Sequence, residues 1–347
     1  MPGVGNAAIS NRGERRRAVR FYARVGKPSA VELVISPTRD RRSVANLVAI
    51  VILPREKCGL TTCTTRYLVA MATADLLTVT FQIVLWRVSY YYFPGSFLDI
   101  TPVCSAISAL GMIATDCSVW FTVTFTFDRF VAICCQKLKT KYCTGRTAAV
   151  ILTTAGVLLC FQNVPFFFIY QPVRVIKNIP WDCSRKSSTQ TDPAWQGYFW
   201  QDTVLTPLLP FVLILLLNAL TVRHILVASR VRKQLRGQSS GENHRDPEME
   251  SRRRSVILLF AISGSFILLW SVHVADFLYY TFAGMDPNND TVSVYILEHS
   301  GDMLLILSCC TNTFIYGVTQ SKFRRQFISA AKYTLTSIIQ LINKQKI

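Results

Sequence analysis

Charged side chains are scarce in this sequence of 347 residues. Asp, Glu, Lys and Arg make up 17% of it, whereas about a quarter is usual for a soluble domain. Acidic residues are the scarcer sign, with 20 Asp and Glu against 38 Lys and Arg. The sequence also lacks a nucleophile–base pair and any spacing typical of metal ligands, which argues against an enzyme. The odd number of cysteines, 11, argues against a full disulfide framework.

Half of the residues are hydrophobic, and they come in long blocks separated by short charged stretches. A helix that crosses about 30 Å of hydrocarbon needs about 20 mostly apolar residues. Because the basic residues lie between such blocks, the pattern predicts a protein of the lipid bilayer and argues against nucleic acid as a partner. Six blocks are long enough to span: Tyr67–Trp86, Val103–Cys134, Ala148–Tyr170, Phe199–Val222, Val256–Phe282 and Val292–Val318.

A seventh block, Ser43–Leu53, is only half as long as a span. It supplies about 16 Å of helix at 1.5 Å per residue, and Arg41 and Arg42 precede it directly. The sequence therefore predicts an all-α membrane protein, a seven-transmembrane helix bundle over residues 43–318 with a truncated first helix. Residues 1–42 hold ten Lys and Arg against three acids. They are interpreted either as a solvated basic arm or as a segment foreign to the ancestral protein.

The loops differ in charge. Lys and Arg gather in the loops before and after the first long blocks, in residues 223–254 and after Val318, whereas Gly284–Thr291 carries only acids. Basic loops stay on the cytoplasmic side. We therefore expect a multi-pass plasma-membrane protein with a cytoplasmic C-terminus and an interfacial helix in residues 319–347. Asn289 of the outer loop then becomes a glycosylation candidate, since a sequon begins there.

Two features mark opposite ends of the block Val103–Cys134. Asp128-Arg129-Phe130 lies at its inner end, where the neighbouring acid and arginine can form a closed ion pair. Cys104 lies at its outer end, about 38 Å of helix away. Cys183 is the other cysteine expected on the outer, oxidising side. We therefore expect a Cys104–Cys183 disulfide.

Polar residues occur at similar depth in three of the blocks. Asp75, Ser118 and Asn312 supply a carboxylate, a hydroxyl and an amide near the middle of the membrane. Such charged and polar residues inside spans are usually functional. The set predicts a polar pocket that holds either a small cation such as sodium or a network of water without an ion. No other cofactor or metal is expected.

These residues together resemble the rhodopsin-like (class A) G-protein-coupled receptors over Ser43 to about Phe327. The Asp-Arg-Tyr motif of that family appears as Asp128-Arg129-Phe130, and its Asn-Pro-x-x-Tyr motif appears as Asn312 to Tyr316 with Thr313 in place of proline. Asn46 and Asp75 match polar residues of the first and second helices. The resemblance implies that Asn46 bonds toward Asp75.

The resemblance also implies how the protein works. Phe266 and Trp270 match the switch aromatics of the sixth helix, although Val272 replaces the usual proline there. An extracellular ligand would bias an outward swing of that helix, and Arg129 would leave Asp128 to receive a heterotrimeric G protein. The residues expected to couple and switch are Asp128, Arg129, Phe130, Phe266, Trp270, Asn312 and Tyr316. The alternatives are a non-signalling receptor remnant and a membrane transporter, although no inverted repeat is evident.

The ligand is predicted less directly. The run from Thr115 to Ile133 is most similar to orphan receptors of the nervous system that respond to aromatic amino acids, so an aromatic amino acid or a small peptide is expected. Gly111 stands where amine receptors carry an aspartate, which argues against a monoamine. Arg87 could pair with a carboxylate and Asp302 with an ammonium, which would suit a zwitterion. Alternatively, Arg87 could snorkel to the interface. The polar candidates around the pocket are Arg87, Asp116, His273, Asp276, His299 and Asp302.

Overall fold

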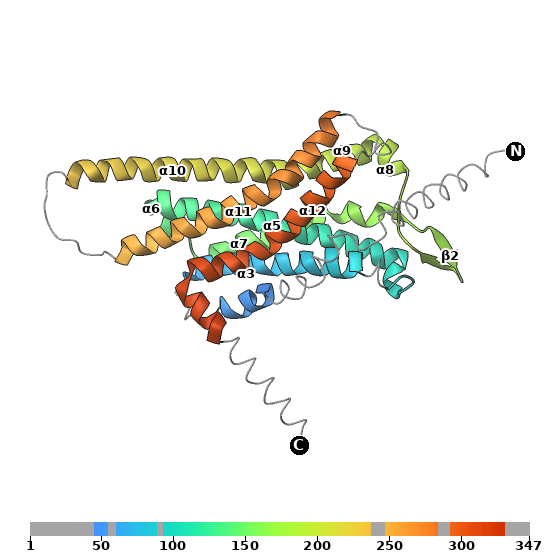
Figure 1. The fold of residues 1–347 in the computed structure, drawn as a ribbon, viewed down its shortest axis with the longest axis horizontal. Coiled ribbons are helices and arrows are strands. Elements are labelled where there is room, and N and C mark those ends of the chain that lie inside the picture. The colour runs from blue at the N-terminus through green and yellow to red at the C-terminus, as the bar shows by residue number, and fades with distance from the viewer. Residues whose placement is uncertain (1–44, 55–59, 89–92, 237–246, 284–291, 330–347) are drawn as a thin grey trace, which may run out of the picture. The chain divides into compact units, whose positions relative to one another are not determined.

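The computed structural model describes residues 45–54, 60–88, 93–236, 247–283 and 292–329. Within these ranges the chain forms the predicted seven-helix bundle, with short strands near one end of it (Figure 1). The elements in chain order are a helix over residues 45–52, α3 (Thr62–Thr78), η2 (Val79–Val88), η3 (Phe97–Asp99), α5 (Thr101–Cys134), α6 (Gln136–Tyr142), α7 (Gly145–Gln162), η4 (Val164–Phe168), β1 (Tyr170–Gln171), β2 (Arg174–Ile176), β3 (Ile179–Trp181), β4 (Ser184–Arg185), α8 (Ser188–Thr191), α9 (Pro193–Thr203), η5 (Val204–Leu208), α10 (Leu209–Arg236), α11 (Pro247–Ala283), α12 (Val292–Thr319) and a helix over Ser321–Ser329.

Five helical segments of the described chain are long and apolar enough to cross a membrane. A sixth joins them when Met303–Thr319 is counted with Ser321–Ser329, which follows it after a bend of 104°. The helix over residues 45–52 is too short to span by itself. Because residues 1–44 lie outside the described part, the predicted truncation of the first helix stays a prediction.

Side-chain caps set where several helices begin. The Thr144 hydroxyl accepts the Thr147 N–H at 3.2 Å and starts α7. Asp192 accepts the Ala194 N–H at 2.9 Å, and Pro193 fits the first turn because a helix leaves that N–H unbonded anyway. The fifth span therefore begins at Pro193, six residues before the Phe199 predicted from hydrophobicity. Pro207 lies inside η5, where its missing N–H accompanies the local π-helical widening.

The loop between α7 and α9 is folded and tied to α5. Strands β2 and β3 form a hairpin whose turn residues Lys177 and Asn178 have φ values of 48° and 64°, the left-handed conformation that two-residue hairpins require. The predicted disulfide between Cys104 and Cys183 is present and joins the loop to the start of α5. The Asp182 N–H also donates to the Asp99 carbonyl at 2.7 Å. The loop is thus fixed over one end of the bundle, which we call the outer end because the loop charges predict that it faces outside.

The inner half of the bundle has a continuous apolar core. Ile52 and Leu53 of the first helix are each 1% exposed and pack in one cluster with Tyr67 of α3 and Tyr316 of α12. Phe323 of the helix Ser321–Ser329 belongs to the same cluster and meets the Tyr316 ring edge-on at 6.1 Å. Burying a Phe side chain contributes about 1.5–3 kcal/mol. Phe323 therefore anchors this short C-terminal helix, which the sequence predicted.

Candidate ligand-binding and signalling sites

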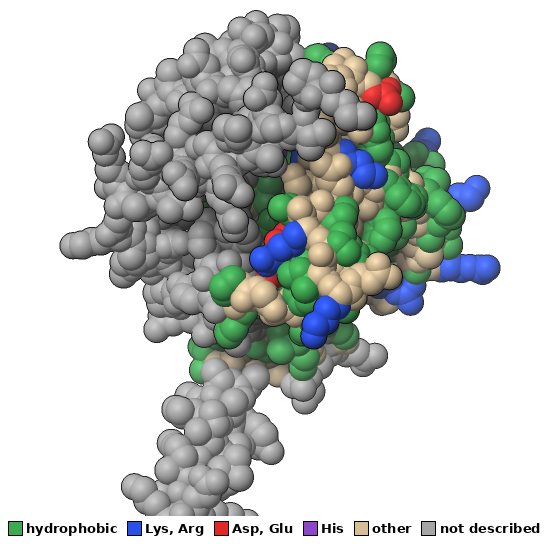
Figure 2. All heavy atoms as spheres, turned by 90° about the vertical axis from the view of Figure 1, so that its right-hand side faces the viewer, with side chains coloured by type: hydrophobic (Ala, Val, Ile, Leu, Met, Phe, Trp, Pro, Cys, Tyr) green, Lys and Arg blue, Asp and Glu red, His purple; other side chains and the backbone are tan. Residues whose placement is uncertain are grey.

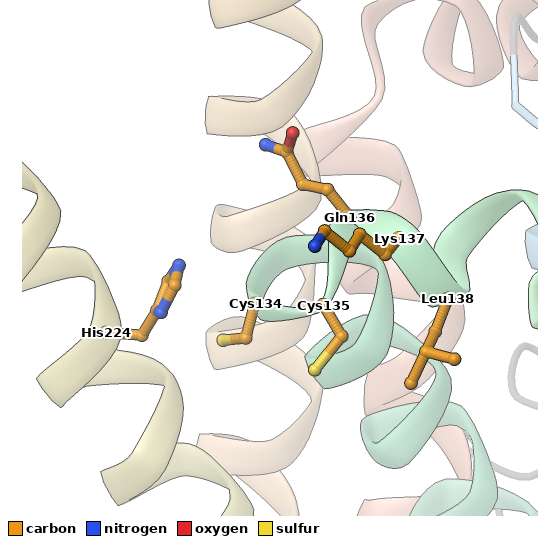
Figure 3. A pocket seen from close by; sticks show the side chains of 6 residues that line it. All are labelled: Cys134, Cys135, Gln136, Lys137, Leu138 and His224. Atoms are coloured by element: carbon orange, nitrogen blue, oxygen red, sulfur yellow. The ribbon is translucent and has the colours of Figure 1, made fainter.

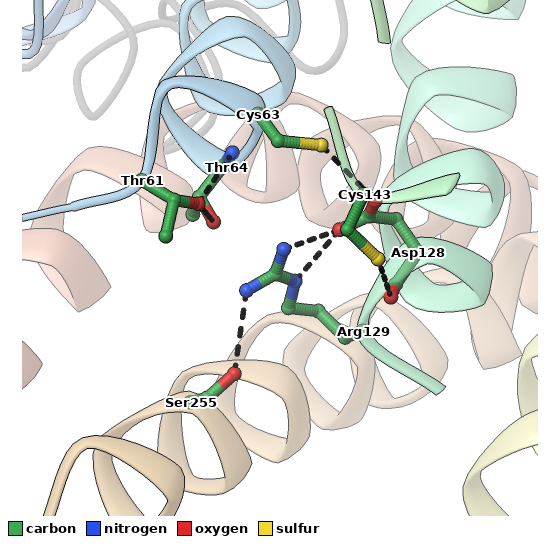
Figure 4. Close-up of polar contacts among 7 residues, drawn as sticks. All are labelled: Thr61, Cys63, Thr64, Asp128, Arg129, Cys143 and Ser255. Atoms are coloured by element: carbon green, nitrogen blue, oxygen red, sulfur yellow. Dashed lines mark hydrogen bonds and ion pairs between the residues drawn. The ribbon is translucent and has the colours of Figure 1, made fainter. Parts of the chain in front are cut away.

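Arg129 joins two helices at the inner end of the bundle. Its Nε donates to the Asp128 carboxylate at 3.0 Å, and its Nη2 forms an ion pair with the same oxygen. Its Nη1 donates to the Ser255 hydroxyl of α11 at 3.4 Å, as Figure 4 shows. The guanidinium also lies 5.8 Å from the centre of the Phe125 ring. An ion pair with Asp128 thus holds Arg129 against its own helix, α5, and a single hydrogen bond to a neutral hydroxyl links it to α11.

Two thiols also donate to Asp128, one to its side chain and one to its backbone carbonyl. The Cys63 thiol of α3 donates to Asp128 Oδ1 at 3.1 Å, and the Cys143 thiol reaches the Asp128 carbonyl at 3.6 Å (Figure 4). Burial, with the charge of Asp128 nearby, raises the pKa of the Cys143 thiol to about 12. That thiol therefore stays protonated at neutral pH and acts as a donor. The neighbouring Phe130 is half-buried, with its ring 6.5 Å from that of Phe127.

The predicted polar residues of the membrane interior do lie together. Asp75 is fully buried; the Ser118 hydroxyl donates to its Oδ1, and the Asn312 amide donates to its Oδ2 at 3.0 Å. In the described residues no cation pairs with this carboxylate, so every partner it shows is neutral. Its two oxygens face two different helices, α5 and α12.

Asn46 does not bond to Asp75, contrary to the expectation. Its amide nitrogen donates to the Cys309 carbonyl at 2.8 Å, and its oxygen accepts the Thr313 hydroxyl at 2.8 Å. Thr313 supplies a donor that a proline at that position could not, so it draws the Asn46 side chain to α12. The first helix is therefore fixed to α12 by two buried hydrogen bonds.

Phe266 and Trp270 of α11 form an aromatic pair in the interior of the bundle. The rings of Phe266 and Trp270 stack at 5.2 Å, and His273 meets Trp270 edge-on at 5.6 Å. The pair packs with Val119 of α5 and Ile214 of α10 in one buried cluster. A Cβ at Gly301 of α12 would stand 3.3 Å from the His273 Cα, so α11 and α12 approach closely here.

The predicted ligand residues are distributed unevenly over the outer half. Asp116 is fully buried and accepts the Asn163 amide at 2.7 Å and the Thr206 hydroxyl at 2.9 Å. Gly111 leaves room for Gln82 of η2, which would stand 2.9 Å from a Cβ there and which donates to Thr115 at 3.0 Å. Asp276, on α11, is buried with 8% exposure. The side chains of Arg87, His299 and Asp302 and the whole of Asn289 lie outside the described part.

The ligand residues predicted from the sequence do not include three polar residues that the structure places around Asp116. Asn163 ends α7, Thr206 lies in η5, and Asp202 lies one turn before Thr206. Each has a signal in the sequence: Asn163 and Thr206 are polar residues in mostly apolar surroundings, and Asp202 is a charged residue inside a predicted span. What the sequence does not provide is which of the other helices each of them faces.

The outer end combines aromatic and basic groups. Phe166, Trp195, Tyr198 and Phe199 pack together, with Tyr198 and Phe199 rings 5.5 Å and 6.2 Å from Phe166. The Arg185 guanidinium lies 4.6 Å over the Phe199 ring. Figure 2, which looks at the end where the hairpin lies, shows hydrophobic, Lys and Arg side chains dominating the visible described surface. The described surface at this end is therefore aromatic and basic.

A cavity of about 650 Å³ lies at the inner end. It is lined by the end of α5, the start of α6 and His224 of α10, and the Cys134 sulfur points toward His224 (Figure 3). Its residues are Cys134, Cys135, Gln136, Lys137, Leu138 and His224. The cavity lies just beyond the Asp128–Arg129 pair along α5 and offers mostly apolar walls.

Comparison with known proteins agrees with this arrangement. A family model described as "7 transmembrane receptor (rhodopsin family)" matches residues 45–316. The FMRFamide receptor of Drosophila melanogaster is 23% identical over 299 residues, which cover 82% of this chain and 50% of that receptor. The chain thus spans about half the length of the curated relative it matches.

Proposed function

Because the chain belongs to the rhodopsin family of seven-transmembrane receptors, we propose that it transmits the binding of an extracellular peptide to a heterotrimeric G protein. The observation that carries this proposal is the Arg129 bridge between Asp128 of α5 and Ser255 of α11. At the inner end Arg129 links α5 and α11 through a strong ion pair with Asp128 and a weak hydrogen bond to Ser255. A modest change in α11 can therefore break the weak contact while Arg129 stays on α5.

The aromatic pair of α11 supplies the connection between ligand and bridge. Trp270 and Ser255 belong to the same helix, α11. A ligand that displaces Trp270 favours a position of α11 in which Ser255 no longer meets Arg129, and the ligand acts only through its different affinity for the two positions. The freed guanidinium then offers hydrogen-bond donors to the C-terminal segment of a G protein. In this orientation the C-terminus faces the cytoplasm and the hairpin faces outside at the plasma membrane.

A peptide is the better supported of the two expected ligand classes. The relative is named for its response to a peptide, although its identity to this chain is 23%. The wide aromatic and basic outer end offers many contacts to a ligand larger than one amino acid. Nothing in the described geometry favours a free aromatic amino acid over a peptide.

We also propose a sodium ion at Asp75. Two oxygens of a fully buried carboxylate, the Ser118 hydroxyl and the Asn312 amide oxygen fit the oxygen ligands of a small hard cation. Bound there, the ion would neutralise a charge that has only neutral partners. It would favour the arrangement in which α5 and α12 both face Asp75 of α3.

The test is nucleotide exchange with the purified receptor in lipid nanodiscs. Purified G proteins of each class are added with amidated short peptides, FMRFamide among them, and in parallel with Phe, Tyr and Trp. We expect a peptide to stimulate exchange, and we expect Asp128→Asn to raise exchange without ligand because it frees Arg129. Exchange that stays at background for every G protein, even in Asp128→Asn, would overturn the proposal and favour a non-signalling remnant.

A further inference from the structure

Two carboxylates lie in the outer half of the bundle without a positive partner. Asp116 on α5 is 0% exposed. Asp202 on α9 has a buried Oδ1 without a partner at full hydrogen-bond geometry, and its neighbouring donor is the neutral amide of Gln162 on α7. The two side chains are near enough for their charges to repel each other. Within the described chain, no Lys, Arg or His forms an ion pair with either.

The hydrogen bonds around Asp116 and Asp202 leave some buried acceptor oxygens without a donor. Asn163 donates its amide nitrogen both to Asp116 at 2.7 Å and to the Leu159 carbonyl at 2.9 Å. Because both contacts require the nitrogen there, the amide orientation is fixed, and the Asn163 oxygen is left as a buried acceptor without a donor. Asn163 is itself 0% exposed. The cluster thus holds two incompletely paired acceptor oxygens, on Asp202 and Asn163, beside one neutral donor, the Gln162 amide, and two carboxylates that no described cation balances.

Such a cluster is costly unless a cation completes it. Carboxylates inside a membrane protein are expensive and normally paired, and each buried acceptor without a donor adds a further cost. An ammonium brings three N–H donors and a guanidinium brings five, with no acceptor that would clash with the oxygens. The missing partner therefore has the chemistry of an organic cation.

The walls beside the acids suit the same group. Tyr198 and Phe199 lie on α9 within one turn of Asp202 and pack with Phe166. Cations are attracted to the faces of such rings. The Arg185 guanidinium already occupies the Phe199 ring at 4.6 Å without bonding to either acid. The aromatic wall thus accepts a guanidinium at its outer side, next to the acid pair.

We propose that Asp202 and Asp116 form the subsite that receives a cationic group of the ligand. Asp202 binds the cationic group directly, and the Asn163 oxygen accepts one of its other N–H groups. Asp116 does not touch the cation but attracts it by its negative charge from the far side of the Asn163 amide. This inference rests on the proposed peptide-receptor function and deepens it. It assigns to the ligand an arginine, a lysine or a free amino terminus that enters between α5, α7 and α9.

The first experiment needs neither the natural ligand nor a G protein. Thermal unfolding of the purified receptor is measured with Nα-acetyl-arginine amide, its lysine counterpart and its uncharged citrulline counterpart at millimolar concentration. A compound that binds only the folded state raises the melting temperature. We expect the arginine or lysine compound to raise it and the citrulline compound not to. The stronger of the two cations identifies the guanidinium or the ammonium.

Matched variants connect that shift to the acid pair. Asp202→Asn keeps the shape and removes the charge, so it should abolish the shift, and Asp202→Glu should restore part of it. Asp192→Asn, ten residues earlier, is the control because Asn still caps α9 and the residue is exposed. A shift that persists in Asp202→Asn, or one that the citrulline compound reproduces, would overturn the proposal.

A second experiment applies once a peptide agonist is in hand. Replacing its basic residue by citrulline should lower its potency on the wild type by about tenfold or more, because a buried charge loses its partner. The same replacement should change little on Asp202→Asn, since the partner is already missing. Equal losses on both receptors would overturn the assignment while leaving the peptide-receptor function intact.

Discussion

The inner and outer ends of this bundle treat buried acids in opposite ways. Asp128 is buried beside Arg129 and pairs with it within the same helix. Asp116 and Asp202 are contributed by two helices and have only neutral partners in the described chain. The inner charge is therefore balanced by a neighbouring side chain, whereas no described side chain balances the outer charges, which we propose meet a cation of the ligand.

The contrast separates two kinds of function. A self-balanced pair can rearrange without a ligand, and its balance depends on the position of neighbouring helices such as α11. An unbalanced pair gains most when an external cation arrives, which makes it a recognition site. Asp75 lies between the two in depth and in character, with two good hydrogen bonds and no cation. Four sets of variants test this contrast, from the largest expected effect to the smallest.

Arg129→Ala should have the largest effect. It should abolish nucleotide exchange, because the guanidinium that would meet the G protein is gone. It should also destabilise the receptor by about 3–5 kcal/mol, since Asp128 stays buried without its cation. The double variant Asp128→Asn/Arg129→Ala should regain surface expression but not exchange. Undiminished exchange by Arg129→Ala at matched surface expression would show that this arginine is not the coupling residue.

The same substitution at two acids should have opposite consequences. Asp128→Asn should lower the free energy of unfolding by about 1.5–3 kcal/mol, because a hydrogen-bonded charged group loses its charged partner. Without sodium, Asp75→Asn should leave stability unchanged or raise it, because no described cationic side chain loses a partner there; with sodium, the wild type alone should gain stability. Thermal unfolding in nanodiscs, with and without sodium, measures both. A similar loss in the two variants would refute the distinction between balanced and unbalanced acids.

Thr313→Val tests a buried hydrogen bond between two neutral side chains, Thr313 and Asn46. The valine keeps the shape but removes the donor to Asn46, so a buried oxygen loses its partner at a cost of about 1–3 kcal/mol. Thr311→Val is the control, because that hydroxyl bonds within its own helix to Leu307. Surface expression and melting temperature should fall only in the first variant. If both behave alike, the Thr313–Asn46 bond does not hold the first helix.

Ser255→Ala should have the smallest effect. It removes the neutral bond between Arg129 and α11, worth about 0.5–1.5 kcal/mol. We expect ligand-independent exchange to rise by about two- to twelvefold, which is the factor that corresponds to this free energy, with at most the same small loss of stability. Ser265→Ala, whose hydroxyl bonds to its own helix, should show no rise. A lower exchange in Ser255→Ala would mean that this contact favours the signalling arrangement instead.

Much of the fold could be predicted because it depends on local sequence. The long apolar blocks became helices, since their backbone groups have no partner in lipid other than each other. The disulfide followed from two cysteines on the outer side. The start of the fifth span at Pro193 was missed, because hydrophobicity does not register the polar first turns that Asp192 caps.

The sequence by itself determined the number and order of the helices, their orientation preference and the Asp128–Arg129 pair, because these depend on neighbours along the chain. Only the tertiary structure decided that Asn46 bonds to α12 and that Asp116 meets Asn163 and Thr206. The rotation and depth of each helix fix those contacts, and they result from the packing of the whole bundle. A polar residue in an apolar run signals that it needs a partner, but only packing selects which one.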